Sequence, residues 1–180
     1  INIDHAVITD DDKRAIEFGV EQDVDWVGIS FVRTLEDMLF AKAYLNKVGS
    51  RSLVMAKLER GEGIDNLDSI LNEVDGVMVA RGDLGVEIAM ERVPLVQKEI
   101  VRKASEIGKG SCIATQILRS MVVSPTPTRA EVSDISNAVL DGCDSILLSD
   151  EIAVGEYPVE AVRVADITIR EAEKVYPFYK

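Results

Sequence analysis

Val77-Met-Val-Ala-Arg-Gly-Asp-Leu-Gly-Val-Glu87 joins a short apolar run to a cation, a glycine and a carboxylate. The apolar run has the length of a strand that is buried on both faces. Gly82 allows a ligand to approach the main chain closely, and a short helix beginning at Leu84 would turn nearby amides into an anion site. Asp83 beside them offers the oxygen ligand that a hard divalent metal prefers. The stretch predicts a phosphate or carboxylate site at a strand end, and a solvated Gly-Asp turn is the alternative.

The composition favours one domain of helices and parallel strands. The 180 residues are 47% hydrophobic but only 5% aromatic, so Val, Ile, Leu and Ala must form the core. The net charge of −12 argues against nucleic acid and anionic membrane surfaces as general partners. No apolar run is long enough to span a bilayer.

The two cysteines and the single histidine give no sign of a metal site or a disulfide. Cys112 and Cys143 both lie inside apolar runs, so we expect buried, reduced thiols and a cytoplasmic location. His5 alone is too little for a histidine-based metal site.

Hydrophobic periodicity predicts strands that alternate with helices along the whole chain. Thr9 and Thr34 have the pattern of helix N-caps, Pro94 and Pro158 suit helix starts, and Gly61 with Gly63 is expected to form a turn. The expected strands cover residues 24–31, 53–58, 76–80, 111–115 and 145–148. The expected helices contain residues 10–19, 38–48, 67–74, 94–107, 132–139 and 158–172. This alternation indicates a parallel α/β fold without a second domain.

Each predicted strand finishes in polar residues, which in a parallel sheet meet at one edge. Lys57 lies inside an apolar strand, where a lysine is costly unless it is paired or functional. Lys57 and Glu59 are two residues apart and therefore face the same side. Glu59 and Asp83 would come from neighbouring strands and could share one Mg²⁺ ion. Lys57 beside them would stabilise charge on a transferring phosphoryl group, whereas a structural ion pair is the alternative.

Several of these segments make the sequence similar to the pyruvate kinase family over nearly its whole length. The most specific are the run from Met78 to Glu87 and Pro127-Thr-Arg-Ala-Glu131. Further matches are Phe18 to Asp25, Ser30-Phe-Val-Arg33, Ala56-Lys-Leu-Glu59, Ala114-Thr-Gln116, Ser133-Asp134 and Asn137 to Gly142. The resemblance implies a glycolytic transferase that moves the phosphoryl group of phosphoenolpyruvate to ADP, giving pyruvate and ATP.

The resemblance also implies roles for particular residues. Lys57 is the expected catalytic lysine, and Glu59 and Asp83 are the expected ligands of Mg²⁺ or Mn²⁺. The amides of Gly82 and Asp83 and the Thr115 hydroxyl are expected to bind the substrate carboxylate. The family forms homo-oligomers, tetramers in the intact enzyme, and Arg129 is expected near a subunit interface.

The resemblance implies a (β/α)8 TIM barrel, of which residues 1–180 would supply about five βα units of the catalytic domain. The inserted β domain, the C-terminal regulatory domain, the K⁺ ligands and a substrate arginine are not expected within this chain. A whole barrel needs about 250 residues, and five strands would leave two open edges.

Four residues depart from the family pattern. Arg60 replaces an asparagine, Gly110 a proline, Asp150 a glycine and Ile152 a threonine. The changes at Asp150 and Ile152 lie at a strand end, where they could alter substrate or nucleotide fit. They favour, for the isolated chain, a non-catalytic remnant that acts as a folding or interaction module. An aldolase-like metal enzyme is a third hypothesis, but it does not account for the Pro127–Glu131 segment.

Overall fold

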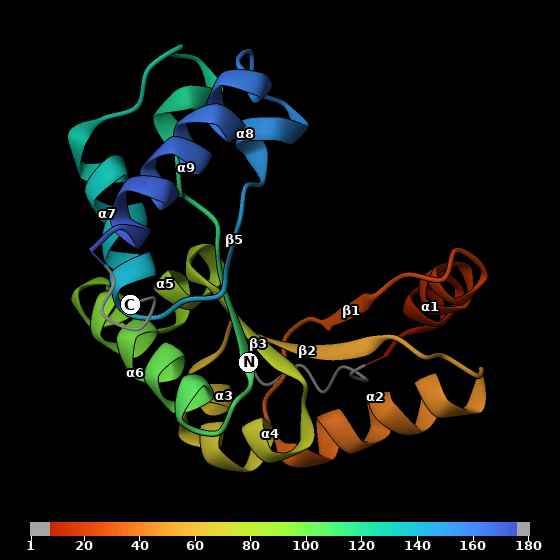
Figure 1. Cartoon of the computed structure of the whole chain (residues 1–180). Helices are drawn as coiled ribbons and strands as arrows, with labels where there is room; N and C mark the ends of the chain where they lie inside the picture. Colours follow the sequence, from red (N-terminus) through yellow and green to blue (C-terminus); the bar gives the residue numbers. More distant parts are fainter. Residues whose placement is uncertain (1–7, 176–180) are drawn as a thin grey trace.

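Five parallel strands that pair in chain order organise the structure (Figure 1). A computed structural model describes residues 8–175, so His5 lies outside the described residues. The strands are β1 (Trp26–Ile29), β2 (Leu53–Leu58), β3 (Gly76–Ala80), β4 (Gly110–Ala114) and β5 (Ser145–Leu147). The predicted parallel α/β class is therefore confirmed, and within the described residues β1 and β5 form the two outer strands of the sheet.

The register of the strands brings their carboxyl ends to one edge. Ile29 pairs with Ala56, and Leu58 pairs with Val79. Ala114 pairs with both Ala80 and Leu147. Residues that follow each strand therefore emerge on the same side of the sheet, as the sequence predicts.

Helices connect the strands and cover one face of the sheet (Figure 1). The long helices are α1 (Asp10–Glu21), α2 (Leu35–Lys47), α6 (Val93–Glu106), α7 (Arg129–Leu140) and α9 (Pro158–Glu173). The short ones are α3 (Gly61–Asp65), α4 (Leu67–Glu73), α5 (Arg81–Glu87), α8 (Asp150–Ala153) and the 3₁₀ turns η1 (Met90–Arg92) and η2 (Arg119–Val122). Thr9, Thr34 and Thr128 each close a capping box at the start of a long helix, which satisfies amides that the helix leaves unpaired.

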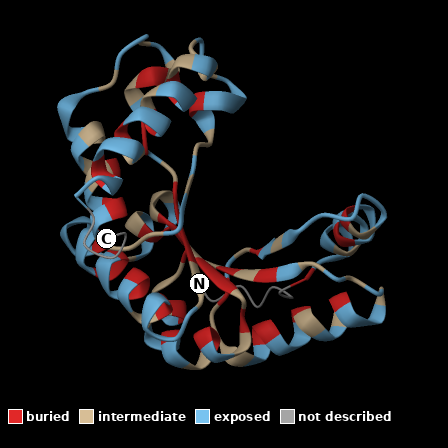
Figure 2. Ribbon diagram, viewed as in Figure 1, coloured by how far each residue is buried: buried red, intermediate tan, exposed pale blue. Residues whose placement is uncertain are grey.

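The sheet is buried on its helix-covered face and largely open on the other. Ile29, Val54 and Leu58 point toward the helices and are at most 5% exposed. Trp26 and Leu53 point the other way and are more than 40% exposed. Figure 2 shows the same division, with buried residues gathered where strands and helices face each other. The third and fourth strands are covered best, since only Met78 of the third and Gly110 of the fourth are not fully buried.

Two aspartates organise the amino ends of the strands. A carboxylate oxygen of Asp75 accepts from the amide of Val54 at 2.8 Å. Asp144 accepts from the amide and the hydroxyl of Ser111, at 2.8 and 3.0 Å. Each aspartate thus precedes one strand and binds the start of its neighbour, which helps to fix the register.

The structure corrects several boundaries that the sequence predicts. Gly61 and Gly63 lie in helix α3 rather than in a simple turn. The first strand ends at Ile29, because Phe31 has a left-handed φ of 55° that turns the chain away. The fourth strand ends at Ala114 because Thr115 has a φ of 69°. The helix predicted from Leu84 begins instead at Arg81, and neither α8 nor η2 was predicted.

Both cysteines are free thiols, as predicted, although only Cys112 is fully buried. Cys143 is half-buried, and its thiol donates to the carbonyl of Ser145 at 2.9 Å. Burial raises the pKa of Cys143 to about 11, so this thiol stays protonated at neutral pH. Among residues 8–175, no helix combines the length and apolar character that a membrane crossing requires.

Glu131 joins the start of α7 to the 3₁₀ turn η2. Its carboxylate accepts from the amides of Ser120 and Thr128, both at 2.7 Å, and from their hydroxyls at 2.6 and 2.8 Å. Burial alone would raise the pKa of Glu131, but these hydrogen bonds outweigh burial and hold the pKa below its ordinary value. The carboxylate therefore stabilises the fold above its unfolded-state pKa, and this contribution is lost as pH falls through the folded-state pKa.

We predict that Glu131→Gln lowers the free energy of unfolding by about 1–2 kcal/mol at pH 7, because the amide cannot accept all four hydrogen bonds. The deficit should shrink below about pH 4, where the wild-type carboxylate becomes protonated. Urea unfolding at both pH values measures this difference, with the exposed Glu156→Gln as control. A deficit of equal size at both pH values would contradict the assignment.

Candidate functional site

Ser30, Lys57 and Glu59 form a polar cluster where β1 and β2 end. The ammonium of Lys57 donates to Ser30 Oγ at 2.9 Å and lies 2.8 Å from Glu59 Oε1. The side chain of Glu59 is only 2% exposed, whereas that of Lys57 is 28% exposed. The two-residue spacing thus places both side chains together, as the sequence predicts, and Lys57 has the ion-pair partner that its position requires.

The turn after β1 completes the surroundings of Glu59. With its left-handed φ of 55°, Phe31 directs its amide to Glu59 Oε2 at 2.6 Å. The guanidinium of Arg60 lies 5.5 Å from the centroid of the Phe31 ring. Both oxygens of Glu59 therefore have a donor, but a carboxylate has about four lone-pair positions, so Glu59 retains capacity to bind a cation.

A second group of predicted site residues meets where β3 and β4 end. Gly82 lies in the first turn of α5, and its amide donates to Thr115 Oγ1 at 2.7 Å. Asp83 follows in the same turn with an exposed side chain. Gly82, Asp83 and Thr115 are thus close enough to act on one ligand.

Thr115 and its neighbour Gln116 have backbone angles that are unusual for their residue types. Their φ values are 69° and 54°, a region that costs of the order of 1–3 kcal/mol for a non-glycine residue. The carbonyls of both residues accept hydrogen bonds from the guanidinium of Arg81. Arg81 also pairs with Asp134 on α7 at 2.6 Å. The sequence identified Arg81 as a cation but not these partners, which are far away along the chain.

The end of β5 contains the two changes from the family pattern. Asp150 begins the short helix α8 and forms an exposed ion pair with Arg119, so the position does not need the left-handed freedom of a glycine. Glu151 is 1% exposed and accepts from the amides of Leu118 and Ser149, at 3.0 and 2.8 Å. Ile152 is 48% exposed. The added charge is therefore locally compensated, and Glu151 ties the end of β5 to the segment that follows β4.

The described residues 8–175 contain no cluster of three or more His, Cys, Asp or Glu side chains that could hold a metal ion. Mg²⁺, however, often uses only one or two carboxylates and takes its other ligands from water and substrate. Glu59 and Asp83 follow adjacent strands, and the first is buried and held in place by hydrogen bonds. This pair of oxygen donors suits such a cation.

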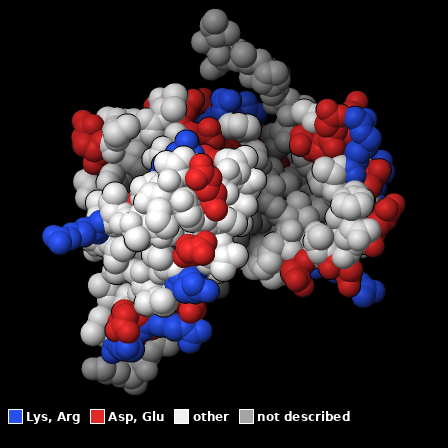
Figure 3. Space-filling model, turned by 90° about the horizontal axis from the view of Figure 1, so that it is seen from above, with Lys and Arg blue, Asp and Glu red and all other residues white. Residues whose placement is uncertain are grey.

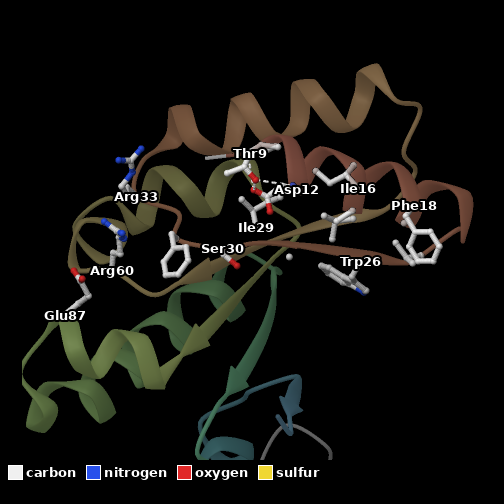
Figure 4. A pocket seen from close by; sticks show the side chains of 17 residues that line it. Thr9, Asp12, Ile16, Phe18, Trp26, Ile29, Ser30, Arg33, Arg60 and Glu87 are labelled. Atoms are coloured by element: carbon white, nitrogen blue, oxygen red, sulfur yellow. Dashed lines mark hydrogen bonds between the residues drawn. The ribbon is translucent and has the colours of Figure 1, made fainter. Parts of the chain in front are cut away.

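The structure contains a hollow of about 1020 Å³ that the sequence did not predict, between α1 and β1 (Figure 4). Arg33, Arg60 and Glu87 lie at one end, while Phe18 and Trp26 lie at the other. Ser30 lies between the two ends, so the hollow adjoins the Lys57–Glu59 cluster. The sequence signal available for this apolar wall was the tryptophan at position 26. In the structure Trp26 lies on the outer strand β1 and is exposed.

Charged side chains of both signs lie on the face of the molecule that Figure 3 shows. On the face shown in Figure 3, acidic and basic side chains are interspersed and no continuous basic patch is visible. An anionic ligand would therefore depend on local donors and cations, such as those at the strand ends.

Comparison of the sequence with known proteins identifies relatives of this chain. Residues 1–162 match the family model described as pyruvate kinase, barrel domain. The chain is 47% identical to the pyruvate kinase of Thermotoga maritima over 173 residues, which are 96% of this chain and 37% of that protein. It is 47% identical to the pyruvate kinase of Clostridium acetobutylicum over 174 residues, again 96% and 37% of the two chains. The pyruvate kinase of Dictyostelium discoideum is 47% identical over 168 residues, or 93% of this chain and 33% of that protein. The chain thus spans only about a third of the length of these curated relatives.

We predict that Lys57→Met lowers the free energy of unfolding by about 1–3 kcal/mol, because it leaves the buried Glu59 carboxylate without its cation. The double variant Lys57→Met/Glu59→Gln should recover most of the loss. Lys13→Met, which breaks an exposed pair with Asp10, should cost much less, because solvent screens this pair. Urea unfolding of the wild type, Lys57→Met, Glu59→Gln, the double variant and Lys13→Met measures the coupling, and strictly additive losses would show that the pair does not contribute to stability.

Proposed function

Because this chain belongs to the pyruvate kinase family and corresponds to its barrel domain, we propose that the carboxyl edge of its sheet is part of a phosphoryl-transfer site. The reaction would move the phosphoryl group of phosphoenolpyruvate to ADP, giving pyruvate and ATP. The observation that carries the proposal is the convergence of Lys57, Glu59, Gly82 and Thr115 at one edge, each within hydrogen-bonding distance of another member of the set.

In this proposal the substrate carboxylate binds where β3 and β4 end. The amides of Gly82 and Asp83 are at the start of α5, where backbone donors favour an anion. The Gly82 amide donates to Thr115 Oγ1 at 2.7 Å, which leaves the Thr115 hydroxyl proton to donate to a carboxylate oxygen, and the Gly82 amide would donate to the ligand by exchanging this bond for one to the carboxylate. Donors held at fixed positions lose little entropy when the ligand binds.

A divalent cation, Mg²⁺ or Mn²⁺, would bind between Glu59 and Asp83. Bound there, it would supply positive charge against the oxygens of substrate and phosphate. The contacts of Glu59 with the Lys57 ammonium and the Phe31 amide hold its carboxylate in position. The exposed Asp83 would complete the pair.

Lys57 would stabilise the phosphoryl group as it moves from an oxygen of phosphoenolpyruvate to an oxygen of ADP. Phosphoryl transfer depends mainly on positioning and on charge stabilisation, which a held ammonium group provides. Ser30 and Glu59 hold the Lys57 ammonium at 2.9 and 2.8 Å. The partly exposed lysine thus keeps access to a ligand on the open side of the sheet.

The wider context of this site is also proposed from the family. The five parallel strands would be part of a closed (β/α)8 barrel, with K⁺ ligands and a substrate arginine supplied from outside this chain. Assembly into a homo-oligomer and a cytoplasmic location complete the proposal. Within residues 8–175, β1 and β5 each pair on one side only, which favours a second candidate for the chain alone, namely an association module without catalysis.

We predict that the chain binds one Mn²⁺ ion and that Asp83→Asn weakens this binding by about tenfold or more, because the amide cannot supply an anionic oxygen ligand. Titration followed by the paramagnetic resonance signal of free Mn²⁺ measures the affinity. Asp68→Asn is the matched control, since Asp68 is an exposed carboxylate paired with Lys103 on the helix-covered side. Equal affinity of Asp83→Asn and wild type would exclude Asp83 as a ligand.

We also predict that the purified 180-residue chain has no useful kinase activity. Several charge-stabilising groups would be missing together, and each well-placed donor of this kind contributes of the order of 10²–10³ in rate. An open sheet also leaves the site wet, which weakens its electrostatic interactions. An assay that couples ADP phosphorylation by phosphoenolpyruvate to a dye measures the rate. Turnover of about 1–100 s⁻¹, as in ordinary kinases, would contradict the prediction.

A further inference from the structure

Two successive residues after β4 adopt a conformation that their side chains disfavour. Thr115 and Gln116 have φ values of 69° and 54°. Threonine is branched at Cβ, which makes a left-handed backbone particularly unfavourable for it. Such a conformation persists only where surrounding contacts impose it, and such sites are often functional.

The contacts that impose it come from one side chain, Arg81. Its Nε and Nη2 donate to the Thr115 carbonyl at 3.2 and 2.9 Å, and Nη2 also donates to the Gln116 carbonyl at 3.0 Å. On the other side Nη1 donates to Asp134 Oδ2 at 2.6 Å and to Gln97 Oε1 at 3.4 Å. Arg81 therefore fixes two consecutive carbonyls of the strained turn against α6 and α7.

The geometry of the guanidinium suits it for positioning rather than for contact with a substrate. Its five N–H donors are distributed over these acceptors, and the side chain is 12% exposed. The planar, rigid fork fixes the directions of the bonds it makes, which a lysine ammonium in the same place cannot do.

The strained turn has one visible consequence at the predicted site. It holds Thr115 Oγ1 at 2.7 Å from the amide of Gly82, the residue that follows Arg81. The segment that provides the amide thus also provides the guanidinium that places the hydroxyl opposite it. A shift of the turn would separate the two groups.

We propose that Arg81, oriented by Asp134, is a positioning residue that holds the Thr115 hydroxyl at the carboxylate-binding site. Its role in ligand binding rests on the function proposed above, whereas its effect on the Thr115–Gly82 hydrogen bond does not. Arg81 acts entirely through Thr115, so removing Thr115 should abolish the effect of changing Arg81 on the ligand.

The test combines ligand titration with amide hydrogen exchange on the full chain. The probe is oxalate with Mg²⁺, and the variants are Arg81→Lys, Thr115→Ala and the double variant. We expect each single variant to weaken oxalate binding by about tenfold, and the double variant to bind within about twofold of Thr115→Ala. Exchange at the Gly82 amide should become at least about tenfold faster in Arg81→Lys, beyond any change at the core amide of Val79.

Two further variants complete the test, one as a control and one as a substitute for Arg81→Lys. Lys98→Met breaks another ion pair to α7, with Asp141, and should leave both measurements unchanged. If Arg81→Lys does not fold, Asp134→Asn keeps the guanidinium but removes the negative charge that Nη1 faces, and it should change both measurements in the same direction by a smaller factor.

The proposal is overturned if the losses of Arg81→Lys and Thr115→Ala multiply to about a hundredfold, because Arg81 would then act independently of Thr115. It is equally overturned if Gly82 exchange is accelerated by Thr115→Ala but not by Arg81→Lys. If the wild-type chain binds no oxalate, the carboxylate site of the proposed function fails, and Gly82 exchange alone then decides the positioning role of Arg81.

Discussion

The parallel pairing of five strands in chain order is the constraint on which the rest of the structure depends. It sends the residues after every strand to one edge, so side chains from distant parts of the sequence can meet there. The strand-to-helix connections place the helices on one face, and that face carries most of the buried residues. The opposite face retains half-buried and exposed side chains such as Lys57, which is where a ligand could be reached.

Two clusters of polar residues lie at this edge of the sheet. Lys57 and Glu59 come from one strand and its first following residue, and a left-handed Phe31 directs its amide at the carboxylate. Gly82 and Thr115 come from different strands, and Arg81 holds the second against the first. The first cluster supplies opposite charges, and the second supplies neutral donors. In the proposed function, the two clusters together would complement a ligand that carries both phosphate and carboxylate groups.

Much of this arrangement could be predicted because it depends on patterns of residues that are close together in the sequence. The helix N-caps at Thr9 and Thr34, the strand at residues 53–58 and the shared side of Lys57 and Glu59 follow from local sequence patterns alone. The left-handed turn at Thr115 could not be predicted, since the chemistry of threonine disfavours it and Asp134, which orients Arg81, lies far along the chain. The helix at Gly61–Asp65 was missed for a related reason, because glycine is a poor helix former in isolation.

In the proposed function, Glu59 and Asp83 bind one divalent cation beside the Thr115 hydroxyl. A crystal structure of the chain with Mn²⁺ and oxalate, with anomalous data collected for manganese, tests this site most directly. We expect a single strong anomalous peak about 2.1 Å from oxygens of both Glu59 and Asp83, with an oxalate carboxylate against Gly82 and Thr115. A manganese peak elsewhere, or ordered carboxylates of Glu59 and Asp83 more than about 6 Å apart, would contradict it.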